Sequence, residues 1–216
     1  MSVVSLELRE KRDRLGLKGP RAAEWLAAQG VELPMTPNTW TQSEGTGAAG
    51  ALLVARLGSA EFFLEDGAAG TAVERISPSL DGNPPGVYPV LREDWAFRLG
   101  GDRVHDVLAQ VCNVNFAALP LASRPVIMTL MIGVAVLEVP QSVDARGGAA
   151  EQIGAAERIG AAERIGAAER IGAADKFGAA ERHYRIWCDP TFGPYLGESL
   201  GAVVIECGGR YTGVSG

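Results

Sequence analysis

The chain has 216 residues, 47% of them hydrophobic, so it can form a packed core and is not disordered as a whole. Its 20 basic and 26 acidic side chains give a net charge of −6, which argues against a general nucleic-acid binder, because such a protein needs a dominant positive field. The amino terminus has no apolar signal-peptide core, and the longest uncharged apolar run, Val126 to Leu137, is shorter than the roughly 20 residues of a membrane helix. We therefore expect a cytoplasmic protein, with that run in its core and with neither nucleic acid nor membrane as a partner.

The first half of the sequence predicts a strand, a helix, a hairpin and a second helix. A short apolar run from Arg14 ends at a turn at Gly19, and helix-forming residues follow over Ala22 to Gln29. Two apolar runs within Ala51 to Asp66 flank a glycine-containing turn, which is typical of a β-hairpin. A short helix is expected over Ala68 to Ile76.

The second half predicts the same elements in the same order. An alternating strand begins at Trp95 and leads into a helix with Asp102 as its expected N-cap. The apolar strand Val126 to Val139 is expected to pair with His183 to Asp189, and a helix is expected over Thr191 to Leu200. The two strands of this second hairpin are separated by a long insertion.

These elements predict an α+β protein made of two ferredoxin-like βαββα modules, each with its helices on one face of a sheet. The first module with an N-terminal arm is placed at residues 1–94 and the second at residues 95–216. Residues 147–182 are a low-complexity insertion of hexapeptides, such as IGAAER, within the second module.

The hexapeptide tract fits neither of two regular structures. As a helix it has no apolar face, because each repeat turns by about 600°, and one glycine per repeat costs about 1 kcal/mol. As a hexapeptide β-helix it would bury charge, since the fourth residue after Ile153 is Glu157 and later repeats do the same. The tract is therefore expected to be a tandem expansion that forms a flexible or partly helical excursion.

Two short motifs resemble catalytic or cofactor-binding signatures but lack their context. Gly45, Gly47 and Gly50 form a GxGxxG that precedes a predicted strand, whereas a dinucleotide site requires the motif to follow a strand and open a helix. Ser199 is the centre of a GxSxG, but no histidine follows it in the sequence, so a hydrolase triad in that order cannot form. We expect a glycine-rich loop at the first motif and a helix end near Ser199.

The cysteines and histidines predict no metal centre. Cys112, Cys188 and Cys207 form no CxxC pair, and an odd number of cysteines favours a reducing compartment over a disulfide framework. His105 and His183 have no zinc-ligand spacing. The sequence thus predicts no catalytic, cofactor-binding or metal-binding residue in this chain.

The N-terminal arm carries a local excess of positive charge within an acidic protein. It could bind an acidic partner surface, or it could be a solvated arm. Its basic residues are Arg9, Lys11, Arg12, Arg14, Lys18 and Arg21.

Outside the tract, most of the chain resembles the gamma subunit of heterotetrameric sarcosine oxidases. The most specific segments are KGPRAAEWL (Lys18 to Leu26) and FGPYL (Phe192 to Leu196), supported by the segment from Phe97 to Phe116. The resemblance implies an aminomethyltransferase-like fold and partnership with alpha, beta and delta subunits. It also implies that FAD, FMN, NAD, zinc and tetrahydrofolate are held by those other subunits, and none by this chain.

Two functions follow from the resemblance. The first is a non-catalytic accessory subunit of a complex that oxidatively demethylates sarcosine. The alternative is a folate-dependent one-carbon transfer protein that works alone. That function requires a carboxylate at the cleft between the modules, and Glu61 and Glu65 are the nearest candidates, although we expect both to face solvent.

Overall fold

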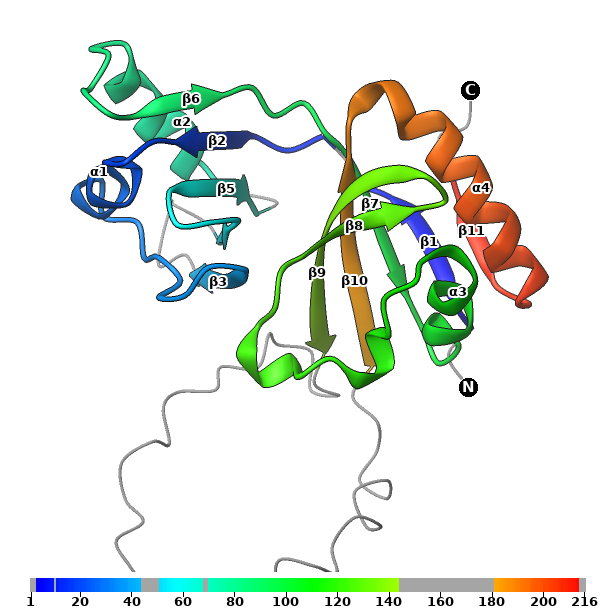
Figure 1. Cartoon of the computed structure of the whole chain (residues 1–216). Coiled ribbons are helices and arrows are strands. Elements are labelled where there is room, and N and C mark those ends of the chain that lie inside the picture. The colour runs from blue at the N-terminus through cyan, green and yellow to red at the C-terminus, as the bar shows by residue number, and fades with distance from the viewer. Residues whose placement is uncertain (1–2, 10, 44–50, 68–69, 144–180, 214–216) are drawn as a thin grey trace, which may run out of the picture.

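The computed structural model describes residues 3–9, 11–43, 51–67, 70–143 and 181–213, and these form two β-sheets with four α-helices (Figure 1). The predicted α+β class is confirmed. The division into two ferredoxin-like modules stays a prediction. The hexapeptide insertion lies outside the described residues as far as residue 180.

The first sheet is antiparallel, with the strand order β3-β4-β5-β2-β6. The predicted strand at Arg14, the helix after it and the hairpin are confirmed. The second helix is shorter than predicted and begins at Ala72. The elements are β2 (Arg14–Lys18), α1 (Ala22–Ala28), β3 (Thr39–Ser43), β4 (Leu52–Arg56), β5 (Glu61–Asp66), α2 (Ala72–Ile76) and β6 (Tyr88–Val90).

The second sheet has the order β11-β1-β7-β10-β9-β8, and only the β1–β11 pair is parallel. Its first strand, β1, precedes every strand of the first sheet in the sequence but pairs with β7. The chain therefore starts in one sheet, builds the other and then returns. The elements are β1 (Ser5–Leu8), β7 (Trp95–Gly100), α3 (Val104–Val111), β8 (Ile127–Met131), β9 (Val134–Val143), β10 (Glu181–Cys188), α4 (Gly193–Glu206) and β11 (Arg210–Thr212).

The apolar run predicted as one core strand is instead a hairpin of β8 and β9. The two residues between these strands, Ile132 and Gly133, have φ of 49° and 80°, the combination required by a tight type I′ turn. The turn could not be predicted from the sequence, because a β-branched residue such as Ile132 rarely adopts positive φ. The expectation that the whole run is buried is also wrong, since Met128 and Leu130 on β8 are exposed.

Two helix ends differ from the prediction. The N-cap of α3 is Arg103 rather than Asp102, and no side chain caps the helix. Helix α4 continues past Leu200 to Glu206, because Val204 extends the row of buried residues with the i, i+4 spacing of Leu196 and Leu200.

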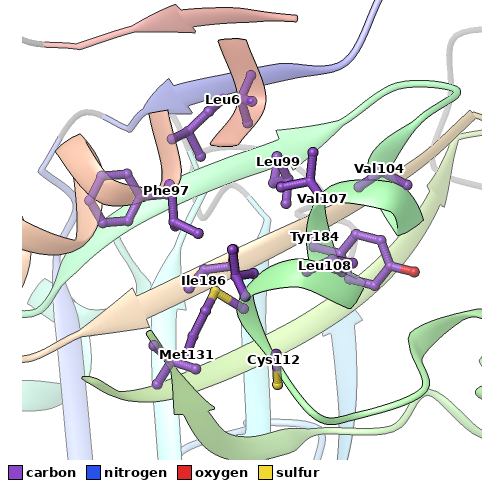
Figure 2. Packing of buried hydrophobic residues seen from close by; sticks show 14 of the residues in the cluster. Leu6, Phe97, Leu99, Val104, Val107, Leu108, Cys112, Met131, Tyr184 and Ile186 are labelled. Carbon is purple, nitrogen blue, oxygen red and sulfur yellow. The ribbon is translucent and has the colours of Figure 1, made fainter. Parts of the chain in front are cut away.

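Strand alternation gives each sheet one face for helices and one for the other sheet. Helices α3 and α4 pack on the outer face of the second sheet, where Leu6, Phe97 and Tyr184 lie in one continuous core (Figure 2). Helices α1 and α2 cover the outer face of the first sheet. The inner faces meet in a third cluster in which Phe63 contacts Trp187 edge to face. This third cluster positions the polar site described next.

Candidate functional site between the sheets

Polar and charged side chains replace the apolar ones at one end of the inner faces. In the first sheet, Glu65 lies directly across from Arg14 on β2 and from Leu53 on β4. In the second sheet, Arg185 lies two residues before Trp187 on β10 and therefore on the same face. The register thus brings one carboxylate and two guanidinium groups to the junction between the sheets.

Glu65 is the centre of this junction, although only 2% of it is exposed. Its Oε2 accepts hydrogen bonds from Arg14 Nε and from Trp187 Nε1, both at 2.6 Å. Its Oε1 accepts a charge-assisted hydrogen bond from Arg185 Nη2. The carboxylate therefore joins the two sheets, and both of its oxygens accept hydrogen bonds from within the chain.

The surroundings of Glu65 are rich in positive charge. Burial lowers the pKa of Arg14. Burial, together with repulsion from Arg9, Arg12 and Arg14, lowers the pKa of Arg185 to about 9. A lowered arginine pKa means that burial, and for Arg185 also the neighbouring arginines, disfavour the charged form at this junction.

A cavity of about 260 Å³ lies beside this junction. Its lining combines the second sheet, the first sheet and the segment that connects β1 to β2. The charged and titratable side chains among the described lining residues are Arg9, Arg12, Glu65, Arg98, His183 and Arg185. The arm arginines at positions 9 and 12 therefore line a cavity between the sheets, and Arg14 is buried, so the arm is not uniformly solvated.

A chain of hydrogen bonds crosses the cavity wall from one sheet to the other. Gln141 on β9 donates through Nε2 to Gln42 Oε1 on β3 at 3.2 Å, and its Oε1 lies 2.8 Å from His183 Nε2. The Nδ1 atom of His183 is buried and has no hydrogen-bond partner. Burial and the nearby charges of Arg98 and Arg9 lower the pKa of His183 to about 4, so the ring is neutral at pH 7.

The two carboxylates considered for pterin binding have different environments. Glu61 is partly exposed and forms ion pairs with Lys18 at 3.2 Å and with Arg92 at 3.6 Å. The expectation that Glu65 faces solvent is wrong. The sequence could not reveal this, because Arg185 and Trp187 are 120 and 122 residues away in the chain.

The two catalytic-looking motifs do not contribute to the site. Ser199 was expected near a helix end. It lies within α4 instead, because this helix extends to Glu206. A strand-to-helix elbow is therefore absent at this serine. Gly45, Gly47 and Gly50 lie outside the described residues.

The cysteines belong to the apolar core of the second sheet, and His105 is partly buried beside it. Cys112, Cys188 and Cys207 are buried free thiols. His105 Nε2 lies 2.7 Å from the hydroxyl of Tyr184, on the outer side of the second sheet. Among the described residues, no group of three histidine, cysteine or acidic side chains could hold a metal ion. No described helix is both long and apolar enough to span a bilayer.

Sequence reasoning also missed the buried carboxyl of Glu138 on β9. It is fully buried on the outer face of the second sheet, and neither of its oxygens has a hydrogen-bond partner. Burial raises its pKa well above the usual value for glutamate. The only sequence signal was one acidic residue within an otherwise apolar strand.

The fold has solved counterparts, although the sequence matches no protein-family model and no curated protein. A chain of the heterotetrameric sarcosine oxidase from Corynebacterium sp. U-96, in complex with pyrrole 2-carboxylate, is similar over 97% of this chain and 88% of its own, with a TM-score of 0.61 and 18% identity. The glycine cleavage system aminomethyltransferase T from Bartonella henselae is similar over 92% of this chain but 45% of its own, with a TM-score of 0.53 and 16% identity. This chain thus spans about half of the aminomethyltransferase. At these identities the likeness establishes the fold alone, and the predicted resemblance is confirmed at that level.

Proposed function

We propose that this chain is a non-catalytic accessory subunit, corresponding to gamma, of a heterotetrameric complex like sarcosine oxidase. One observation carries the proposal: the similarity to a chain of the Corynebacterium oxidase includes nearly all of both chains. The similarity therefore extends over most of one chain of that heterotetramer, which supports a subunit role. The partners would be alpha, beta and delta subunits, and FAD, FMN, NAD, zinc and tetrahydrofolate would be carried by them.

The state of Glu65 supports an accessory role over one-carbon transfer. A carboxylate that holds a pterin must accept hydrogen bonds from the ligand. Three of the roughly four acceptor positions of the Glu65 carboxylate are already used, by two arginines and a tryptophan. The neighbouring cavity, about 260 Å³, is also below the roughly 300–1,000 Å³ of pockets for drug-sized ligands.

Co-expression tests the accessory role. The untagged chain is produced together with tagged alpha, beta and delta subunits from the same source, and the complex is purified through the tag. The expected result is a stoichiometric band of this chain and N-demethylation of sarcosine by the assembly. If the chain instead elutes as a stable monomer and never accompanies the other subunits, the proposal is wrong.

The alternative, a folate-dependent one-carbon transfer protein, is favoured only by the similarity to the aminomethyltransferase, of which this chain spans about half. Calorimetric titration of the full chain with tetrahydrofolate separates the two functions. We expect no binding in the submicromolar range. Tight binding that depends on Glu61 would favour the transferase instead.

A further inference from the structure

The described residues that line the cavity between the sheets carry more positive than negative side chains. Its described lining contains four arginines and one carboxylate. That carboxylate, Glu65, already pairs with Arg14 and Arg185. Arg12 donates to the backbone carbonyl of Asp66 at 3.4 Å, a group without formal charge. The ion pair between Arg98 and Glu7 is long, at 3.8 Å, and both side chains are partly exposed, so this pair is weak.

The strand register places two of these arginines side by side. Arg98 on β7 is directly opposite Arg185 on β10, and both point to the inner face of the second sheet. Like charges in directly opposed positions destabilise a sheet. A negatively charged ligand between or beside the two guanidinium groups would offset this repulsion and so stabilise the folded protein.

Polar groups and space for a ligand are present at the same place. His183, which also lines the cavity, has a buried Nδ1 without a hydrogen-bond partner. The volume of about 260 Å³ greatly exceeds the roughly 30 Å³ that one water occupies in the liquid. It is nevertheless small compared with the pockets of drug-sized ligands. The cavity thus suits a solute of a few heavy atoms.

We propose that this cavity binds a small dianion carrying carboxylate or phosphate groups. Arg98 on β7 and Arg12 in the segment between β1 and β2 would form ion pairs with the ligand, and His183 would contact it. Arginine suits this role because its planar guanidinium donates two parallel hydrogen bonds to either kind of oxyanion. The site lies wholly within this chain, so the inference does not rest on the proposed subunit function.

Calorimetric titration of the full 216-residue chain tests the site, with malonate and inorganic phosphate as separate probes and with chloride keeping the ionic strength constant. We expect saturable binding, and the tighter probe identifies the preferred oxyanion. Arg98→Gln should weaken binding at least about tenfold, since it removes a charged hydrogen-bond donor. Arg12→Gln should weaken it in the same direction.

Arg210→Gln is the matched control, because Arg210 is an exposed residue of β11 in the same sheet and does not line the cavity. It should bind as tightly as the unaltered chain. Arg98→Gln removes like-charge repulsion, so its melting temperature should not fall, and this separates lost binding from unfolding. The proposal is overturned if neither probe binds, or if Arg210→Gln loses as much affinity as Arg98→Gln.

Discussion

At the scale of single residues, Glu65 connects the two sheets through its buried carboxylate. We expect Glu65→Gln to lower the free energy of unfolding by about 3–5 kcal/mol, because it leaves two buried guanidinium groups without a counter-charge. Urea denaturation at pH 7 measures the change. Glu61→Gln is the control, since its ion pairs are partly exposed and should contribute about 0–1 kcal/mol. Equal effects of the two substitutions would contradict the bridging role of Glu65.

The partly buried ring of His183 predicts loss of stability in acid. Its pKa is about 4 in the folded protein and about 6.5 in the unfolded chain. Between these values the unfolded state binds the extra proton, so the free energy of unfolding falls as the pH is lowered from about 6.5 to 4. We expect His183→Gln to reduce this fall by on the order of 2 kcal/mol. Urea titrations across that range, in a buffer free of carboxylate and phosphate, measure the difference, and unchanged pH profiles would contradict the assignment.

Glu138 predicts the opposite dependence on pH. Burial raises its pKa, so the folded protein holds a neutral carboxyl, while the unfolded chain ionises above about pH 4.5. Stability attributable to this group therefore falls as the pH rises. We expect Glu138→Leu to stabilise the protein by about 1–3 kcal/mol at pH 8, because it removes a buried polar group without partners. The gain should shrink at pH 4.5, and thermal unfolding at both values checks it.

At the scale of elements, the sequence predicts local structure well where the turn residue is unambiguous. The hairpin around Gly58 and the helix after Pro20 are specified by neighbouring residues, and both form as predicted. The β8–β9 turn was missed because Ile132 occupies a position where asparagine or glycine is usual. Edge strands β3 and β11 were missed as well, since each is short and gains its stability from a distant partner.

Two separate causes require a glycine at position 101, in the turn between β7 and α3. Gly101 has a φ of 113°, and a Cβ there would lie 2.7 Å from Cα of Val4 on the way into β1. Gly208 has a φ of 78° and open space around it. We expect Gly208→Ala to cost about 1–2 kcal/mol from the backbone alone. Gly101→Ala should cost about 1–3 kcal/mol more, because β1 must shift. Urea denaturation of both variants separates steric crowding from backbone strain, and equal losses would rule out the crowding.

At the scale of the whole molecule, the pairing of strands that are far apart in the chain could not be predicted from the sequence. The α+β class follows from local patterns, but the pairing of β1 with β7 does not, since about 90 residues separate them. The same limit applies to the site. Arg9 and Arg12 were visible as part of a basic arm, whereas their place beside His183 and Arg185 depends on how the two sheets meet.

The pairing of β9 with β10 leads to a prediction for the insertion. Val143 and Glu181 are directly opposite each other, so the ends of the two strands are close enough for a two-residue turn to join them. Replacing residues 144–180 by Asn-Gly shortens the connection from 37 residues to two, about four halvings. Because each halving saves about 0.6 kcal/mol of loop-closure entropy, we expect the variant to be more stable by about 2 kcal/mol. Urea denaturation measures this gain, and co-purification with the other subunits shows whether the shortened chain still assembles. A variant that fails to fold would mean that the insertion is needed for the pairing of the two strands.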